Sequence, residues 1–128
     1  MNLLLDTHAW LWFALGDPQL SEIARAHIVD PANIKFVSPA SYWEISIKIS
    51  LGKYSLNAPY SEFMQRAIDG NGLRHLPLSP AHTERVTTLP FHHRDPFDRL
   101  LIAQALDENM SIVGNDPEFA AYGVPIIW

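Results

Sequence analysis

Short apolar runs alternate along the chain with longer segments in which apolar residues recur at helical spacing. The short runs are typical of strands, and the longer segments are typical of helices. We expect strands over residues 2–5, 35–37, 73–76, 111–113 and 124–127. We expect helices over residues 7–15, 21–29, 39–51, 59–68, 80–89 and 96–109, with a short one after Pro117. Strands and helices therefore alternate through the sequence.

Several helix starts are marked by a proline that follows a residue able to cap a helix. The capping oxygen accepts hydrogen bonds from free backbone N–H groups, and proline fits the first helical position. The pairs of this kind are Ser38-Pro39, Ser79-Pro80, Asp95-Pro96 and Asp116-Pro117. Alternating strands and helices imply right-handed crossovers and a parallel sheet covered on both faces. We therefore expect an α/β fold, a three-layer α/β/α sandwich with a short, mostly parallel central sheet.

The composition supports one folded domain over residues 1–128. Apolar residues make up 48% of the chain and charged residues 18%, a balance that supports a buried core and excludes disorder. The apolar opening segment is interrupted by Asp6 and His8 and has no basic region before it, so we expect no export signal, no membrane span and a cytoplasmic location. The absence of cysteine excludes disulfides, a thiolate nucleophile and cysteine-bound zinc.

The net charge of −5, from 14 acidic and 9 basic residues, bears on possible partners. It argues against a nucleic-acid-binding module that relies on a broad basic field. It does not exclude a nuclease whose acidic residues hold metal ions. The acids therefore need to be located along the chain.

Four acidic residues fall where an α/β sheet can bring them together. Ligands bind such sheets beyond the carboxyl ends of the strands. Asp6 ends the first predicted strand, Asp116 follows the strand at 111–113, and Glu44 and Asp98 lie on predicted helices. Like charges brought this close repel one another unless a hard cation lies among them. An all-oxygen set suits Mg²⁺ or Mn²⁺ better than zinc.

Each acid also has a purely structural explanation, which for Asp98 is a favourable position in the dipole of the helix at 96–109. Asp6 and Asp116 stand where they can cap helices, and either can also bind a cation, whereas Asp95 is best explained as a cap alone. Glu44 lies in the apolar segment SYWEISIKI, where an unpaired carboxylate is costly. Either Lys48, four residues later, or a cation must therefore neutralise Glu44.

Other chemistries lack their motifs. The histidines show no helical H-x-x-x-H spacing, so we expect no histidine-bound zinc. No G-x-S-x-G segment is present to support a serine nucleophile, and no glycine-rich phosphate loop is present.

Three segments together resemble the PIN-domain ribonucleases of the VapC toxin class over nearly the whole chain. They are LLLDTHAWLW, SPASYWEISIKISLGK and HHRDPFDRLLIAQALDENMSIVGNDPEF. The resemblance implies a Mg²⁺- or Mn²⁺-dependent endoribonuclease that leaves a 5′-phosphate and a 3′-hydroxyl. It also implies that the catalytic metal ligands are Asp6, Glu44, Asp98 and Asp116.

Two positions qualify this assignment. Asp95 is an alternative third acid, and Asp98 is preferred because its spacing to Ala103 and Ala105 matches the family pattern. The family often has Thr or Ser two residues before the fourth acid, where this chain has Gly114, and Asn115 is a candidate to compensate. The expected substrate contacts are Thr7, Arg94, Arg99 and Asn115, with solvent exposure as the alternative for the arginines.

The segment AWLWFAL at 9–15 is apolar around its whole circumference. We expect Trp10, Phe13 and Ala14 to meet the core. We expect Leu11, Trp12 and Leu15 to point partly outward, where they can form a protein interface. The alternative is burial under the helix at 21–29. The toxin resemblance favours an interface, with a homodimer and a cognate antitoxin protein as partners beside the RNA substrate.

Rival classes fit less well. A receiver-like, Mg²⁺-binding signalling domain needs paired acids after the first strand and a late lysine, but Thr7 follows Asp6 and the last lysine is Lys53. A haloacid-dehalogenase-like phosphatase needs an aspartate where this chain has His8. A non-catalytic PIN-like subunit, in which the acids serve only as caps and ion pairs, stays open as the alternative.

Overall fold

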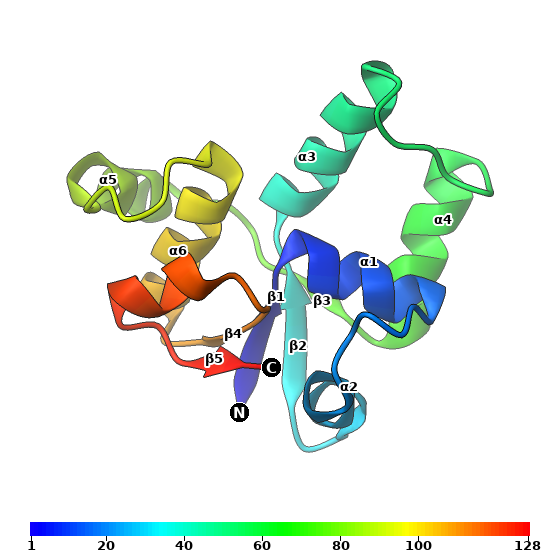
Figure 1. Ribbon diagram of the computed structural model, residues 1–128, viewed down its shortest axis with the longest axis horizontal. Coiled ribbons are helices and arrows are strands. Elements are labelled where there is room, and N and C mark those ends of the chain that lie inside the picture. Colours follow the sequence, from blue (N-terminus) through cyan, green and yellow to red (C-terminus); the bar gives the residue numbers. More distant parts are fainter.

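The computed structural model in Figure 1 describes residues 1–128 and has three layers. The strands are β1 (Asn2–Leu5), β2 (Ile34–Val37), β3 (Arg74–His75), β4 (Ser111–Val113) and β5 (Ile126–Ile127). The α-helices are α1 (Thr7–Leu15), α2 (Glu22–Val29), α3 (Pro39–Ser50), α4 (Tyr60–Ala67), α5 (Pro80–Thr88) and α6 (Pro96–Glu108). Two 3₁₀ helices, η1 (Asp69–Asn71) and η2 (Pro117–Tyr122), complete the chain. The predicted α/β sandwich is confirmed.

The central sheet has the order β3-β2-β1-β4-β5, and every neighbouring pair is parallel. Both edge strands are shorter than their apolar runs predicted. β3 pairs only with β2, which ends at Val37 because Ser38 and Pro39 begin α3. At the other edge, Pro125 precedes β5 and has no N–H to give to a ladder. The sheet therefore narrows toward its edges.

Side-chain caps begin most of the helices where the sequence indicated. Ser38 and Ser79 cap α3 and α5, and Asp116 caps η2. Asp95 accepts hydrogen bonds from the backbone N–H groups of Phe97 and Asp98, so its predicted role as a cap is confirmed. These caps fix where α6 and η2 begin, and with them the positions of two candidate acids.

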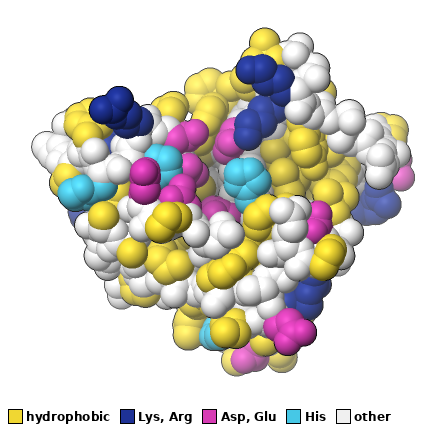
Figure 2. Space-filling view, in the orientation of Figure 1, with side chains coloured by type: hydrophobic (Ala, Val, Ile, Leu, Met, Phe, Trp, Pro, Cys, Tyr) yellow, Lys and Arg dark blue, Asp and Glu magenta, His cyan; other side chains and the backbone are white.

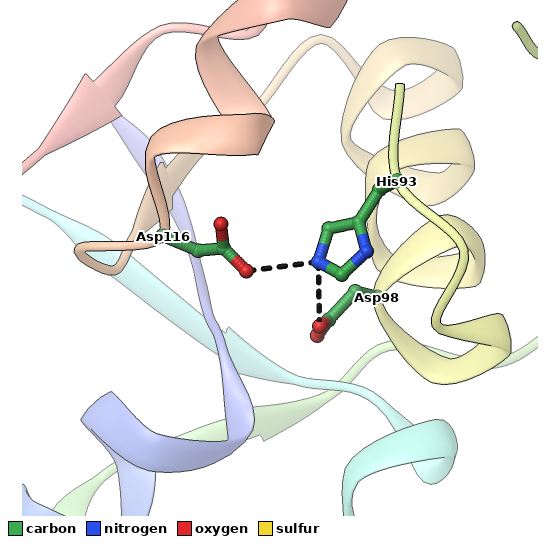
Figure 3. Close-up of side chains that lie close together, drawn as sticks. All are labelled: His93, Asp98 and Asp116. Atoms are coloured by element: carbon green, nitrogen blue, oxygen red, sulfur yellow. Dashed lines mark hydrogen bonds and ion pairs between the residues drawn. The ribbon is translucent and has the colours of Figure 1, made fainter. Parts of the chain in front are cut away.

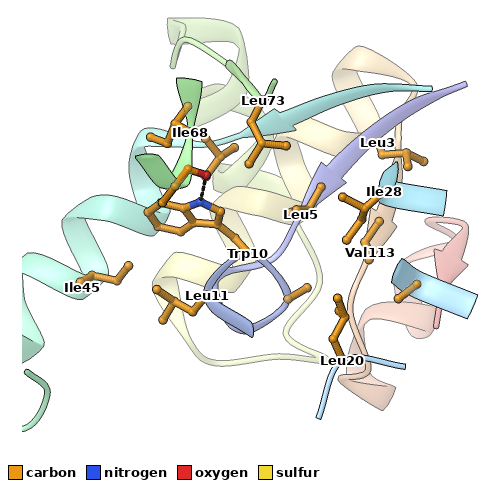
Figure 4. Packing of buried hydrophobic residues seen from close by; sticks show 14 of the residues in the cluster. Leu3, Leu5, Trp10, Leu11, Leu20, Ile28, Ile45, Ile68, Leu73 and Val113 are labelled. Atoms are coloured by element: carbon orange, nitrogen blue, oxygen red, sulfur yellow. Dashed lines mark hydrogen bonds between the residues drawn. The ribbon is translucent and has the colours of Figure 1, made fainter. Parts of the chain in front are cut away.

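Side chains of β1 alternate between two apolar cores. Leu3 and Leu5 face the layer of α1, α2 and α4, whereas Leu4 faces α6 and η2. Figure 4 shows the first core around Trp10, whose indole N–H donates to the Ala67 carbonyl 3.1 Å away. The three leucines of the strand that leads to Asp6 are thus fully buried.

The prediction for the outer stripe of α1 was wrong at one position. Leu11 is only 8% exposed, because α1 packs against both α3 and α4 as well as the sheet. Trp12 is half-buried against Trp128, and Leu15 is exposed. Phe13 and Ala14 are half-buried and pack against the core around Trp10, as predicted.

No helix of this fold combines the length and the apolar character that crossing a bilayer demands. What the fold does provide is one sheet edge at which β1 and β4 end side by side. Asp6 follows β1, and Asp116 lies three residues beyond the end of β4.

Candidate metal centre

Asp6 lies between the end of β1 and the start of α1. Its Oδ1 accepts a hydrogen bond of 2.7 Å from the Ala9 N–H and so caps α1. Its own N–H donates to the Val113 carbonyl, which draws the residue against β4. A Cβ at position 114 would overlap the Asp6 carboxylate, so Gly114 is required by close approach. The structure thus gives a steric reason for the glycine that replaces a hydroxyl residue there.

A second group, shown in Figure 3, contains Asp98, Asp116 and His93. Asp98 is in the first turn of α6, Asp116 caps η2, and His93 lies in the segment between α5 and α6. The Nε2 atom of His93 is 2.8 Å from Asp116 Oδ2 and 3.1 Å from Asp98 Oδ2. Two predicted acids are therefore brought together, with a histidine between them.

Glu44 is held apart from that group by partners of its own. Lys48 Nζ lies 2.9 Å from Glu44 Oε2, and the Thr7 hydroxyl lies 2.9 Å from Glu44 Oε1. Of the two sequence-based alternatives for Glu44, the structure shows the lysine pair. Thr7 is buried, and its hydroxyl faces Glu44 and Ser41 instead of the surface. Thr7 is therefore placed to orient an acid, not to reach a substrate.

Burial and mutual repulsion make the centre costly in its fully charged form. Burial is the main reason why the pKa of Asp6 is raised to about 7. The hydrogen bond from the Ala9 N–H lowers this pKa, and the charges of Asp98, Asp116 and Glu44 raise it further. Burial and the neighbouring Asp95 raise the pKa of Asp98 to about 7, although His93 opposes this. Burial lowers the pKa of His93, but the hydrogen bond to Asp116 and the surrounding carboxylates outweigh it and raise the pKa.

Three of the acids line a cavity of about 420 Å³. Asp6, Asp98 and Asp116 line it together with Asn115, and His8 and Trp12 lie on the same cavity. Figure 2 shows acidic side chains around a hollow in the surface, with histidine side chains beside them. Glu44 does not line the cavity, but it is close enough to raise the pKa values of Asp6 and Asp98.

The donor set fits a hard divalent cation. Asp6 Oδ2 accepts no hydrogen bond from the chain, and carboxylate oxygens are the donors that such ions prefer. A cation among the three carboxylates would also relieve the repulsion that contributes to the raised pKa values of Asp6 and Asp98. Asp6, Asp98 and Asp116 are therefore the residues that could hold it, with Glu44 beside them.

The expectation for Arg99 as a substrate contact is corrected by the structure. Arg99 is 5% exposed, and its guanidinium donates to the carbonyls of Val86, Leu89, Pro90 and His93. It therefore binds the α5–α6 segment and has no surface left for a phosphate. Arg94 is exposed, and Asn115 is exposed at the cavity, so both remain accessible.

Sequence reasoning missed His93, because it tested histidines only for helical pair spacing. His93 lies in an irregular segment. Its partners Asp98 and Asp116 follow it by 5 and 23 residues in the sequence. The one available signal was its place in the HHRDPFD segment, directly before the capped start of α6.

The chain is similar to known proteins in sequence and in fold. Ribonuclease VapC22 of Mycobacterium tuberculosis (strain ATCC 25618 / H37Rv) is 23% identical over 125 residues, which cover 97% of this chain and 94% of that protein. The structure of VapBC2 from Rickettsia felis, bound to a DNA fragment from their promoter, superposes with a TM-score of 0.71 at 17% identity, over 98% of this chain and 97% of that chain. The structure of VapBC-5 from Mycobacterium tuberculosis, a member of the VapBC family of toxin-antitoxin systems, superposes with a TM-score of 0.57 at 16% identity. The superposition covers 98% of this chain and 97% of that chain.

The structural similarities show a shared fold, and a match to the sequence model of one family shows family membership. The model of the PIN domain matches residues 3–125, which is nearly the whole chain. The match contains all three segments on which the resemblance rested, from Asp6 to Asp116. The chain therefore belongs to the PIN domain family.

Proposed function

We propose that this protein is a divalent-metal-dependent endoribonuclease that acts as the toxin of a toxin–antitoxin pair. The observation that carries the proposal is the meeting of Asp6, Asp98 and Asp116 around one cavity in a PIN domain. The relative named Ribonuclease VapC22 supports RNA as the substrate. The VapBC complexes among the structural neighbours support an antitoxin as the partner.

The proposed metal ligands are Asp6, Asp98 and Asp116, with Glu44 as the fourth acid. A bound Mg²⁺ or Mn²⁺ ion would supply an activated water and would neutralise charge that develops on the phosphodiester. Asp6 is oriented by the Ala9 N–H, and Glu44 is oriented by the Thr7 hydroxyl. Lys48 must release Glu44 if that carboxylate is to turn toward the others.

The substrate proposal rests on the groups that stay accessible at the cavity. Asn115 offers an amide on its wall, and Arg94 lies exposed beside the cap of α6. An arginine and an amide can bind phosphate oxygens by hydrogen bonding. These two residues are therefore the proposed contacts to the RNA backbone.

The decisive experiment compares RNA cleavage by the purified protein in EDTA and in buffers with Mg²⁺ or Mn²⁺. We expect cleavage only with a divalent cation. Asp98→Asn should abolish it, whereas Asp95→Asn, which keeps the capping oxygen, should retain substantial activity. Cleavage that survives chelation, or that survives Asp98→Asn and not Asp95→Asn, would refute the proposed centre.

A further inference from the structure

We infer that His93 is a nitrogen ligand of the metal ion at this centre and that Glu118 orients it. The inference rests on the proposed function, because it concerns the same ion. It adds a donor that neither the acid pattern nor the family resemblance assigns. It also predicts which ion the site prefers.

The spacing of the donor atoms is the first argument. Ligand atoms about 2.1 Å from an octahedral ion and at right angles to each other lie about 3.0 Å apart. His93 Nε2 is 2.8 Å from Asp116 Oδ2 and 3.1 Å from Asp98 Oδ2. The three donor atoms all lie within 4.8 Å of one another, as ligands of a single ion do.

The number of hydrogen atoms is the second argument. The Nε2 position of an imidazole carries at most one hydrogen, which lies in the plane of the ring. Two carboxylate oxygens approach that one nitrogen in the structure. One hydrogen cannot form good hydrogen bonds to both oxygens at once. A cation bound to the nitrogen lone pair can be coordinated by the nitrogen and by both oxygens.

Glu118 supplies the third argument. Histidine ligands of metals usually donate their second ring N–H to a carboxylate, which fixes the tautomer and the ring orientation. His93 Nδ1 lies 3.3 Å from Glu118 Oε2. The ring also packs against Phe119, with the ring centroids 5.9 Å apart. The chain thus provides a carboxylate on the far side of the ring from the two aspartates.

Metal binding requires one rearrangement of hydrogen bonds. The Asp95 N–H lies 3.2 Å from His93 Nδ1 and can donate to it only when Nδ1 carries no hydrogen. In the tautomer that binds a metal through Nε2, Nδ1 carries the hydrogen and donates to Glu118 instead. Loss of Glu118 should therefore weaken metal binding, although this residue touches no metal.

A nitrogen donor changes the selectivity of the site. Mg²⁺ prefers oxygen ligands, whereas imidazole binds transition-metal ions well. A site with His93 should therefore bind Mn²⁺ more tightly than Mg²⁺. The same site without the imidazole should lose most of that preference.

The direct test uses Mn²⁺ as a spectroscopic probe on the full chain. Electron spin-echo measurements detect a ¹⁴N nucleus bound to Mn²⁺. We expect nitrogen modulation in the wild-type protein and its change when histidine is labelled with ¹⁵N. His93→Ala should abolish the modulation, and His92→Ala should keep it, because His92 packs on Tyr122 outside the centre.

Calorimetric titration with Mn²⁺ and with Mg²⁺ provides a second readout. We expect His93→Ala to weaken Mn²⁺ binding at least tenfold and Mg²⁺ binding much less. Glu118→Ala should weaken Mn²⁺ binding by roughly tenfold, at the low end for such orienting partners. A far-UV spectrum of each variant establishes that it is folded.

The outcomes separate the inference from the proposed function. If Mn²⁺ binds at the carboxylates without nitrogen modulation, His93 is no ligand and the inference fails, while the metal centre stands. If the modulation persists in folded His93→Ala, the assignment is also overturned. If neither ion binds the wild-type protein, the proposed function itself fails.

Discussion

At the scale of single residues, Asp6 has two opposite effects on the stability of the fold. Its Oδ1 stabilises α1 as a cap, while its burial beside other acids penalises its charged form. A carboxylate kept in such a place indicates a function that outweighs its cost in stability. The cost should be measurable in metal-free protein.

The stability of the metal-free protein should therefore fall as the pH rises. The pKa of Asp6 is about 7 in the folded protein and about 4 in the unfolded chain, so the folded state binds more protons between these values. Thermal unfolding in EDTA should show a melting temperature several degrees lower at pH 8 than at pH 5. Asp6→Asn should reduce this difference and be more stable than the wild type at pH 8. Asp30→Asn, at an exposed cap, should leave the pH profile unchanged.

Gly114 offers a second test at this scale. Gly114→Ala places a methyl group against the Asp6 carboxylate, so we expect a loss of roughly 1–3 kcal/mol in the free energy of unfolding. We also expect weaker metal binding, because the carboxylate must move. Gly70→Ala is the matched control, since its Cβ would be no closer than 3.8 Å to any atom outside its immediate neighbours. Urea denaturation and Mn²⁺ titration of both variants provide the comparison, and equal behaviour would contradict the steric argument.

At the scale of elements, α6 organises the segment that precedes it. Arg99 donates to four carbonyls between Val86 and His93, and its guanidinium stacks on Phe91 with 4.0 Å from Cζ to the ring centroid. One buried side chain thus fixes the course of an irregular segment that contains His93. The position of His93 beside the acids depends on this anchor.

Replacing Arg99 should therefore damage both stability and metal binding. Arg99→Gln leaves several carbonyls without donors, and we expect the free energy of unfolding to fall by roughly 2–4 kcal/mol. Arg94→Gln, at an exposed position, should change it by less than about 0.5 kcal/mol. Urea denaturation of the two variants decides the matter. A neutral Arg99→Gln would show that the segment is held by other contacts.

The elements themselves were predictable because their signals are local. A cap such as Ser38 or Asp95, or an apolar run such as LLL in β1, determines the structure of only the few residues around it. The helices and strands therefore begin close to where these signals lie in the sequence. The roles of Arg99 and His93 depend on contacts across an irregular segment, which no periodic pattern describes. The burial of Leu11 depends on two other helices packing around α1. The convergence of Asp98 and Asp116 was predictable from the parallel sheet, but the pairing of Glu44 with Lys48 stayed one of two alternatives.

At the scale of the whole molecule, apolar surface is left at the C-terminal end of α1, the end away from Asp6. Leu15 is 51% exposed and lines a cavity of about 350 Å³ together with Ala14 and Phe63. Exposed apolar surface of this kind indicates a protein interface. It is the surface on which we expect a second copy of the chain or the antitoxin to bind.

Light scattering over a dilution series tests the expected dimer. The wild-type protein should show a mass near twice 14.5 kDa at micromolar concentration. Leu15→Asp should shift the equilibrium toward the monomer, because it places a charge in the apolar contact. Leu78→Asp, at an exposed leucine before α5, is the matched control and should leave the mass unchanged. A wild type that stays monomeric throughout would overturn the dimer.

The central position of β1 determines when the chain can become active during its synthesis. Its neighbours in the sheet are β2 and β4, so residues 2–5 must wait for residues 111–113 before both edges of β1 are paired. Asp116 is made later still, because it follows β4 in the sequence. A nascent chain that stops before residue 111 has Asp6 but neither β4 nor the fourth acid beside it. A complete site at Asp6 can therefore form only after synthesis has passed residue 116.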